Sequence, residues 1–406
     1  MATTTNEFAK GWPVLLASFI GIGVGITSIA YYSNGIWVLP WQAEFGWSRA
    51  QIGLGQGLAA LVLVVGSPFA GSMIDKYGLR NLTALSLFLY GIGYLLFSYM
   101  SGPIWLFYLI ALMFAFSALL TTPLGFTRSI NAWFHKNRGL ALGLGMTSTG
   151  LGGFLVPKYL TLYVEEHGWR AGYVALFMIV MIAVPLVWLL LKKEVPPAEE
   201  ATEKDKERML TGITLKEAVK QPVFWMIAAI FVFIAVGILG LIPSFIPLLQ
   251  DTGMTLTEAG QFAGILGLSV MAGRILTGFL IDRFFAPRVI TVVFTLVASG
   301  LLALTLYGAE YALYTAIALG FAVGAEVDLI GYLSVRYFGL KHYGAIYGTY
   351  FSLFNLGAVI SPPAAGFIWD KTGDYNLALM IAIGLIVTAV VISLFMPKFP
   401  DSTPAH

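Results

Sequence analysis

The chain has 406 residues, of which 58% are hydrophobic and 11% charged, and its formal net charge is +2. A soluble domain has about a quarter of its residues charged, so this composition predicts a membrane protein, and the small net charge argues against a nucleic-acid partner. The absence of cysteine excludes disulfides, thiolate metal sites and a catalytic thiol. The four histidines fall in predicted loops or at the terminus, so we expect neither a metal site nor a cofactor.

Twelve apolar segments are each long enough to cross a bilayer, which takes roughly 20 residues. We predict spans at 12–39, 50–74, 82–101, 104–133, 139–164, 170–191, 222–249, 257–281, 289–308, 312–337, 343–369 and 376–396. The short polar N-terminus runs directly into the first segment without a cleavage pattern, so we expect that segment to be retained as a span.

The segment from 192 to 221 is charged and contains Pro-Pro, which predicts a solvated linker. It divides the chain into an N-terminal six-helix bundle, 1–191, and a C-terminal one, 222–406. Thr214 and Glu217 fit a capping box and predict a short surface helix within the linker. The sequence therefore predicts an all-α membrane protein built from two six-helix bundles.

The lysines and arginines of the short loops predict the orientation of the chain in the membrane. With the N-terminus inside, the inner loops hold Lys76, Arg80, Lys136, Arg138, Arg283, Arg288 and Lys341, whereas the outer loops hold Arg49, Arg170 and Lys371. The linker adds further positive charges to the inner side. We therefore expect both termini, and the linker, to be cytoplasmic.

The two halves also repeat each other in sequence. The loop GSMIDKYGLR at 71–80 corresponds to GFLIDRFFAPR at 278–288, an offset of 278 − 71 = 207, and WFHKNRG at 133–139 corresponds to YFGLKHYG at 337–344, an offset of 337 − 133 = 204. Nearly equal offsets indicate a duplication and predict pseudo-two-fold symmetry. Transporters built from repeats bind their substrate at the repeat interface near the middle of the bilayer.

These loops resemble the signature of the major facilitator superfamily. WFHKNRGLALGLGMTSTG at 133–150 is similar to the start of span 5 in monocarboxylate transporters, and EFGWSRAQ at 44–51 and RYFGLKHYGAIYG at 336–348 resemble the bacterial members, which are related to oxalate/formate exchangers. We expect a monomeric carrier in the cell inner membrane and not an enzyme. The resemblance also implies symport of a small organic monocarboxylate with a proton, by alternating access.

Arg274 is the main candidate for binding the substrate anion. It lies about seventeen residues into the span 257–281, and an arginine forms a planar fork that suits a carboxylate. The resemblance implies this role, because family members place a carboxylate-binding arginine at this position. The alternative is an arginine that snorkels to the membrane surface, although the eight residues to Asp282 correspond to about 12 Å of helix. Human-type relatives have an aspartate four residues before this arginine, where this chain has Val270.

Glu326 and Asp328 lie in the middle of the apolar span 312–337, where acidic groups are costly and mark functional sites. We expect one of them to carry the coupled proton, and the sequence leaves open which. Two residues apart correspond to about 200° of helix rotation, so we expect that both cannot face one cavity directly. Asp328 shares its face with Tyr332, which is a further candidate for binding the substrate. The alternative is a fixed ion pair with Arg274 or Arg128, or a hydrogen bond between helices.

Further polar residues complete the predicted site. Arg128 lies near one end of the span 104–133. We expect it to line the inner cavity, to pair with an acidic residue of the span 312–337, or to extend its charged end to the membrane surface. The other candidates for the polar lining are Tyr31, Tyr32, Asn34, Tyr350 and Asn355, for which hydrogen bonding between helices is the alternative. The loop-signature residues Asp75, Arg80, Asp282 and Arg288 predict charge contacts that hold an inner gate shut.

A second function remains open from the sequence alone. Acidic groups in mid-membrane also suit cations, so proton-driven export of amphipathic or cationic compounds is the alternative to carboxylate symport. Against it, the span 139–164 lacks the Gly-Pro-x-x-Gly-Gly string typical of such exporters. A receptor or a membrane enzyme is disfavoured, because the sequence has no Ser/His/Asp set and no additional soluble domain.

Overall fold

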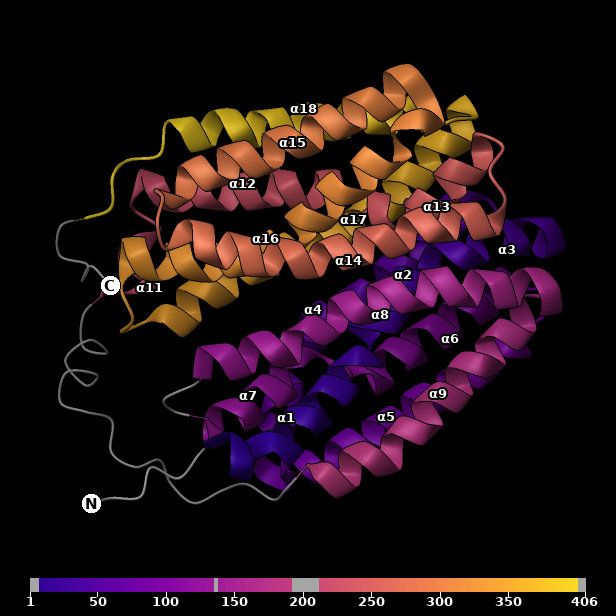
Figure 1. Cartoon of the computed structure of the whole chain (residues 1–406), viewed down its shortest axis with the longest axis horizontal. Helices are drawn as coiled ribbons and strands as arrows, with labels where there is room; N and C mark the ends of the chain where they lie inside the picture. Colours follow the sequence, from indigo (N-terminus) through magenta and orange to yellow (C-terminus); the bar gives the residue numbers. More distant parts are fainter. Residues whose placement is uncertain (1–6, 135–137, 192–211, 401–406) are drawn as a thin grey trace.

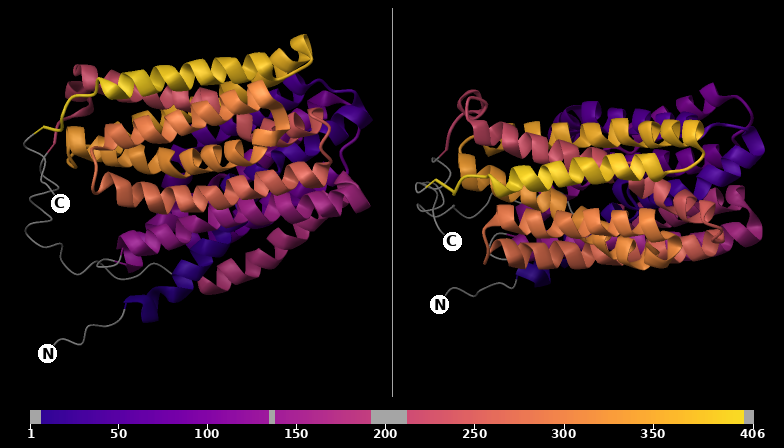
Figure 2. Two further views of the ribbon diagram at one scale, coloured as in Figure 1. Left: turned by 45° about the horizontal axis from the view of Figure 1, so that its top comes forward. Right: turned by 90° about the horizontal axis from the view of Figure 1, so that it is seen from above.

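The computed structural model describes residues 7–134, 138–191 and 212–400, apart from a few side chains that include that of Asp75. Within these ranges the chain is almost entirely helical, and its only β-type pairing is an isolated bridge between Gly212 and Gly339. The long helices run roughly along one common direction (Figures 1 and 2). Helices α1–α9 lie on one side of the molecule and α12–α18 on the other (Figure 1). We call these the N-terminal and the C-terminal group.

Both groups consist of long helices joined by short turns. The N-terminal group comprises α1 (Glu7–Gly23), α2 (Tyr31–Ser33), α3 (Val38–Phe45), α4 (Arg49–Tyr77), α5 (Leu79–Ser98), α6 (Ile104–Ser117), α7 (Pro123–Trp133), α8 (Arg138–His167) and α9 (Trp169–Leu190). The C-terminal group comprises α12 (Pro222–Ile238), α13 (Leu241–Asp251), α14 (Leu256–Ile281), α15 (Ala286–Tyr307), α16 (Ala312–Phe338), α17 (Tyr343–Thr372) and α18 (Asn376–Leu394).

The predicted spans agree with the observed helices. Among the described residues, 10 helices are long and apolar enough to cross a membrane, or up to 11 if one bent pair counts as a span. One of them, 286–338, contains both α15 and α16, which pack against each other after a turn at Gly308–Tyr311. Each of the twelve predicted segments therefore coincides with a helical stretch, and the predicted fold class is confirmed.

Three predicted spans are interrupted, which the sequence analysis did not anticipate. The first changes to a π-helix over Ile26–Ala30 and to a 3-10 helix over Asn34–Trp37. The fourth bends by 50° between α6 and α7, where Pro123 begins a new helix, and the seventh breaks at Leu239 and Gly240. Irregular backbone at membrane depth is tolerated where it is buried in protein or lines a cavity, so these breaks point to the site.

The sequence repeat has a structural counterpart in the helix starts. α4 and α14 begin at residues 49 and 256, α5 and α15 at 79 and 286, and α9 and α18 at 169 and 376, each an offset of 207. α8 and α17 begin at 138 and 343, an offset of 205. The helices of the two groups therefore follow one another in the same order with the same spacing.

The most extensive contacts between the two groups are those of α8 with α14 and of α4 with α17, and α13 also contacts α2 and the 3-10 helix Asn34–Trp37. Both of the extensive contacts depend on glycine. A Cβ added at Gly267 would lie 2.0 Å from the carbonyl carbon of Gly153, and one added at Gly53 would lie 2.5 Å from the carbonyl oxygen of Pro362. Small residues of this kind let helix backbones approach closely in membranes.

These close approaches all lie toward one end of the bundle. Along α8 and α14 they run from Gly150 beside Met271 to Glu165, whose carboxylate accepts hydrogen bonds from Thr257. We call the end of the bundle where α4 begins and α8 ends the closed end, and the opposite end, where α8 begins and α16 ends, the open end.

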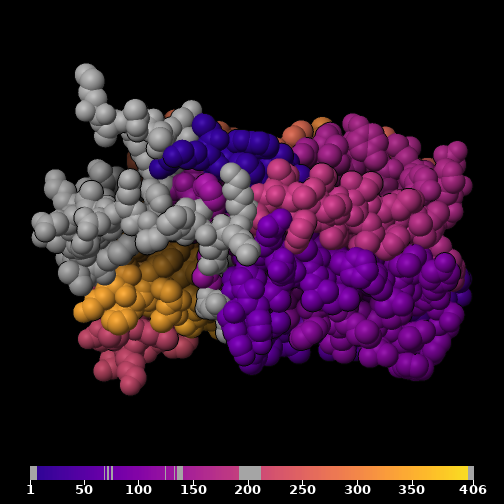
Figure 3. All heavy atoms as spheres, turned by 90° about the horizontal axis from the view of Figure 1, so that it is seen from below, coloured from indigo at the N-terminus to yellow at the C-terminus, as the bar shows by residue number. Residues whose placement is uncertain are grey.

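The outer surface of the bundle is apolar. On α5 and α9, large side chains such as Phe88, Ile182 and Leu189 are 46%, 65% and 63% exposed. Figure 3 shows the outside of the N-terminal group, where the side chains of these helices form a continuous surface. Exposed apolar area on this scale is unfavourable in water and is suited to the hydrocarbon of a bilayer.

A short capped helix is present where Thr214 and Glu217 predict one. Thr214 caps α11 (Leu215–Ala218): its hydroxyl accepts from the Glu217 backbone at 3.3 Å, and the Glu217 carboxylate accepts from the Thr214 backbone at 2.7 Å. These hydrogen bonds from Thr214 lower the pKa of Glu217. The rest of the predicted linker, 192–211, lies outside the described residues.

Candidate functional site

A cavity of about 1350 Å³ lies between the two groups. Its wall on the N-terminal side comes from the interrupted first segment and from residues of α4 to α9, and its wall on the C-terminal side comes from α13, α14, α16 and α17. Gly339 and Leu340, in the turn after α16, line its mouth at the open end. Eight of the ten residues predicted to bind substrate or proton line it: Arg274, Glu326, Asp328, Tyr332, Tyr31, Tyr32, Asn34 and Asn355.

Arg274 is positioned by close contact between α14 and α16. A Cβ at Gly324 would lie 2.8 Å from the backbone nitrogen of Arg274, so glycine at 324 allows the two helices to meet there. The guanidinium Nε lies 4.0 Å from a carboxylate oxygen of Asp328. Nε is buried and makes no hydrogen bond with any described residue. The Arg274 guanidinium is therefore held in the cavity wall, and Asp328 is its counter-charge, 4.0 Å away.

Glu326 and Asp328 both reach the cavity wall, which differs from the expectation that they could not. The face of α16 that lines the cavity includes Val327 and Gly331, and each acid is displaced from Val327 by about 100° of helix rotation, in opposite directions. The two acids therefore lie at the two edges of one face. Their environments differ: the Asp328 side chain is 35% exposed and faces Arg274, whereas Glu326 is 1% exposed.

Glu326 has no charged partner among the described residues, and one of its carboxyl oxygens is buried without a hydrogen bond there. Tyr31 and Tyr32 lie close enough to interact with it electrostatically. Burying an isolated carboxylate costs several kcal/mol, so the structure holds an acid in a dry position beside two phenols.

Tyr31, Tyr32 and Asn34 come from the irregular part of the first segment. The Tyr31 hydroxyl donates to the carbonyl oxygen of Leu239 at 3.3 Å, and Leu239 lies at the break between α12 and α13. The rings of Tyr31 and Tyr32 pack edge to face with their centroids 5.4 Å apart. The broken first and seventh segments thus meet at the cavity, and paired interruptions in corresponding positions of two repeats are typical of transporter binding sites.

Two predicted ligands lie elsewhere. Tyr350 is 1% exposed and packs inside the C-terminal group, where its hydroxyl donates to the carbonyl oxygen of Phe224 at 3.1 Å. Arg128 is exposed, and the described cavity wall includes Thr127 and Asn131 from α7 but not Arg128. Tyr350 and Arg128 lie on other sides of their helices than the neighbouring residues that line the cavity, because the helix repeats every 3.6 residues. We therefore do not keep either residue among the proposed ligands.

No ion pair between the predicted inner-gate residues is seen among the side chains that the structure describes. The Arg80 Nε donates to the carbonyl oxygen of Trp188 at 2.6 Å, and its guanidinium stacks on the Trp188 ring at 4.2 Å, so this contact stays within the N-terminal group. Asp282 and Arg288 are exposed at the end of α14 and the start of α15. The side chain of Asp75 lies outside the described part of the chain.

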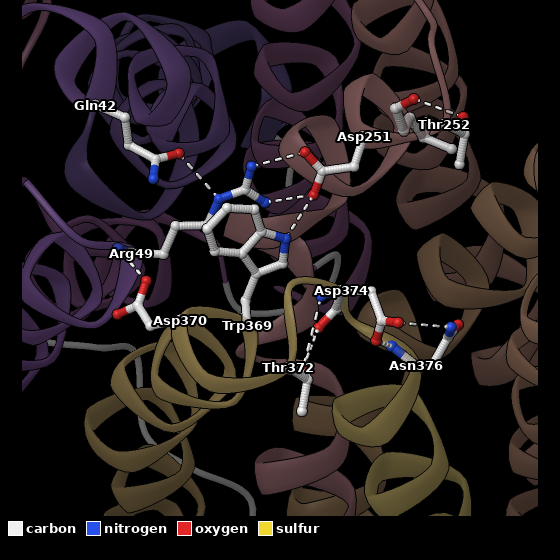
Figure 4. Close-up of polar contacts among 10 residues, drawn as sticks. Gln42, Arg49, Asp251, Thr252, Trp369, Asp370, Thr372, Asp374 and Asn376 are labelled. Atoms are coloured by element: carbon white, nitrogen blue, oxygen red, sulfur yellow. Dashed lines mark hydrogen bonds and ion pairs between the residues drawn. The ribbon is translucent and has the colours of Figure 1, made fainter. Parts of the chain in front are cut away.

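The closed end holds a charged network that the sequence analysis missed (Figure 4). Arg49, at the start of α4, donates two hydrogen bonds to the Asp251 carboxylate, at 2.6 and 2.7 Å. It also stacks on the ring of Trp369 at 3.7 Å. We refer to Arg49, Asp251, Trp369 and Asp370 as the outer clamp, which joins α4 of one group to α13 and α17 of the other.

A sequence signal for the clamp existed. Ser48 and Gln51 form a capping box that begins α4 at Arg49. A cation in the first turn of a helix opposes the helix dipole, so Arg49 requires a carboxylate nearby. From the sequence alone, Arg49 was predicted only as a charge of an outer loop, and Asp251 was assigned no role.

Comparison with known proteins supports the fold and identifies the family. The family model of the Major Facilitator Superfamily matches residues 14–362. The chain is 26% identical to YhjX of Escherichia coli, described as an uncharacterized MFS-type transporter, over 83% of this chain and 85% of that protein. It is 24% identical to human monocarboxylate transporter 11, over 96% of this chain and 83% of that protein.

A solved structure has the same fold. The inward-facing, occupied structure of a bacterial homolog of the human lysosomal transporter Spinster superposes with a TM-score of 0.73, at 16% identity and with 96% of each chain covered. The family match spans most of this chain, and the relatives are transporters, a non-enzymatic class. The chain belongs to the Major Facilitator Superfamily and is a multi-pass membrane transporter.

Proposed function

We propose that the protein is a secondary active carrier that moves a small organic monocarboxylate together with a proton by alternating access. The observation that carries this proposal is the position of Arg274. It is a fixed cation in the wall of the cavity between the two groups, 4.0 Å from the acid Asp328. The similarity to monocarboxylate transporters supports the same substrate class.

Arg274 supplies the chemistry for binding an anion. A guanidinium stays charged at any physiological pH and pairs with a carboxylate through two parallel hydrogen bonds. Asp328 is too far from Arg274 to make such a pair, at 4.0 Å. A substrate carboxylate would therefore bind the Arg274 guanidinium in competition with Asp328, which interacts with it only weakly.

Asp328 is the acid we assign to the coupled proton. While the cavity is empty, the charge of Arg274 favours its carboxylate form. When a substrate anion occupies Arg274, Asp328 loses that counter-charge and faces a like charge, so the protonated form becomes favoured. Anion and proton then bind together, and the loaded site is closer to neutral. Within the described residues, Glu326 has no such cation beside it, so a substrate anion at Arg274 takes no counter-charge away from Glu326.

The two groups are the domains that we propose move against each other. We infer that they correspond to 1–191 and 222–406, joined by the linker 192–221. The cavity reaches the open end, while glycine contacts and the outer clamp close the other. The distribution of lysine and arginine supports a cytoplasmic position for the open end, so we propose an inward-facing carrier in the cell inner membrane.

Export of amphipathic cations is the second candidate. It is favoured by the acid Glu326, which is 1% exposed, and by aromatic side chains that line the N-terminal side of the cavity, among them Trp37, Trp41 and Phe97. Arg274 argues against it, because a fixed cation repels a cationic substrate.

Transport by the purified protein in proteoliposomes separates the two candidates. An inward proton gradient is imposed, and uptake of a panel of labelled monocarboxylates is compared with movement of labelled lipophilic cations. We expect proton-driven accumulation of at least one carboxylate and inhibition of that uptake by other carboxylates. Proton-driven extrusion of the cations without any carboxylate uptake would overturn the proposal.

A further inference from the structure

We propose that the outer clamp is the outer gate of this carrier, in which Arg49 holds the closed end shut and must release Asp251 and Asp370 each time the cavity opens to that side. The proposal rests on the alternating access described above. It does not depend on which substrate the carrier moves.

The first argument is the strength and placement of the central pair. Arg49 is 4% exposed and meets Asp251 in a bidentate arrangement, at 2.6 and 2.7 Å. Charge-assisted pairs with this geometry are the strongest hydrogen bonds between side chains. The Arg49 Nε also donates to the Gln42 side-chain oxygen at 3.0 Å. This hydrogen bond within the N-terminal group fixes the orientation of the guanidinium that binds Asp251 on α13.

The second argument is that α17 contributes to the same point. The indole nitrogen of Trp369 donates to the Asp251 carboxylate at 2.9 Å while its ring lies against the guanidinium. The next residue, Asp370, accepts hydrogen bonds from the backbone N–H groups of Arg49 and Ala50, both at 2.9 Å. A carboxylate of one group therefore caps the first turn of a helix in the other, where the helix dipole favours negative charge.

The third argument is the position of the clamp relative to the cavity. A small void beneath it is lined by Arg49, Ser244 and Tyr375, and also by Gln56, Pro243 and Pro362, which line the large cavity as well. The clamp therefore lies directly over the closed end of the cavity. When the groups separate at this end, Arg49 leaves with α4, and both carboxylates leave with α13 and α17.

A second arginine at the closed end provides a matched control. Arg170 meets the Glu44 carboxylate in the same bidentate way, at 2.7 and 2.6 Å, and the indole of Trp169 also donates to Glu44, at 2.8 Å. All three residues belong to the N-terminal group. This pair has nearly the same chemistry as the clamp, but movement of one group against the other leaves it intact.

The test uses the fact that the chain has no cysteine, so a single introduced cysteine is the only labelled site. Ser244→Cys reports on the closed end, because Ser244 is 8% exposed beneath the clamp. Ser352→Cys reports on the cavity, whose wall it forms. Ser18→Cys, at a fully buried position of α1, reports unfolding. The rate of reaction with a hydrophilic maleimide is measured for protein in nanodiscs.

We expect Arg49→Gln to raise the labelling rate of the Ser244→Cys reporter by about tenfold or more, which corresponds to a shift of about 1.4 kcal/mol. The Ser352→Cys reporter should slow, and the Ser18→Cys reporter should stay unreactive. Arg170→Gln should change none of the three rates. Unchanged labelling of Ser244→Cys in the Arg49→Gln protein, or equal acceleration by Arg170→Gln, would overturn the proposal.

Two further variants keep the result interpretable. If Arg49→Gln makes the Ser18→Cys reporter reactive, the variant has unfolded, and Asp251→Asn, which keeps the arginine, decides the question by the same three rates. Exchange of the charges, Arg49→Asp with Asp251→Arg, should restore slow labelling of Ser244→Cys. Because labelling needs no transported substrate, these outcomes stand even if no monocarboxylate is carried.

Discussion

Replacing Asp328 by asparagine tests how anion binding and protonation are linked. In the wild-type protein the charged Asp328 competes with the substrate anion for Arg274. Protonation removes this competition, so the wild-type protein should bind a monocarboxylate more tightly as the pH falls. Asparagine resembles the protonated acid in shape and charge. Asp328→Asn should therefore bind the anion tightly at every pH.

The size of the effect follows from the geometry. Two unit charges 4.0 Å apart attract each other by about 4 kcal/mol at an effective dielectric constant near 20. The Asp328 side chain is 35% exposed, so solvent screening reduces this value toward the range of exposed pairs, about 0–1 kcal/mol. We take about 1.4 kcal/mol, which predicts roughly tenfold tighter binding by Asp328→Asn at a pH where the wild-type acid is charged.

Calorimetric titration of the purified protein at two pH values measures this directly, with Glu326→Gln as the control. Glu326→Gln should keep the pH dependence of the affinity, because Glu326 has no charged partner that the substrate displaces. In proteoliposomes, Asp328→Asn should still exchange labelled for unlabelled carboxylate but should no longer accumulate it against a gradient. Undiminished pH dependence in Asp328→Asn, or its loss in Glu326→Gln, would refute this division of roles.

Two further predictions concern packing. A Cβ at Gly267 would lie 2.0 Å from the carbonyl carbon of Gly153, whereas ordinary contact begins at 3.4 Å. Gly267→Ala must therefore separate α8 and α14 locally by about 3.4 − 2.0 = 1.4 Å. We expect this variant to lower the free energy of unfolding by about 1–3 kcal/mol, measured by thermal unfolding. Gly278→Ala, on the same helix with open space around its Cβ, should not lower the melting temperature, because alanine favours the helix more than glycine does, and equal losses in both variants would contradict this reading. Tyr350→Phe removes one buried hydrogen bond and should lower the free energy of unfolding by about 0.5–1.5 kcal/mol without changing KM for uptake. A raised KM would show that Tyr350 contributes to substrate binding.

The sequence predicted the helices well because the physical signal for a span is strong. Long apolar runs bounded by charge leave little choice of structure in a bilayer, and the observed helix bounds differ from the predicted ones by a few residues. The breaks were missed because an interrupted span keeps the composition of a continuous one. The Ile26–Ala30 π-helix contains only Thr27 and Ser28 as polar residues, and the break at Leu239 and Gly240 contains none, so the mean hydropathy of both spans stays high.

The site was predictable where an ionisable residue stood alone in an apolar run. Arg274, Glu326 and Asp328 were found in this way, and all three line the cavity. Tyr350 was misplaced because the helix face that a tyrosine occupies depends on packing between helices. Arg49 was missed because a charge at a helix end is expected on any surface, and only the fold brings Asp251 beside it.

The most direct measurement of the central claim is proton-driven carboxylate uptake by Arg274→Gln in proteoliposomes, with Arg283→Gln as the control. Arg283 stacks on Phe279 in the turn after α14, outside the cavity wall. Loss of hydrogen bonds to a charged partner costs about 1.5–3 kcal/mol, so Arg274→Gln should bind the anion roughly ten- to a hundredfold more weakly and lose uptake. Arg283→Gln should transport normally. Full uptake by a correctly folded Arg274→Gln protein would contradict the account.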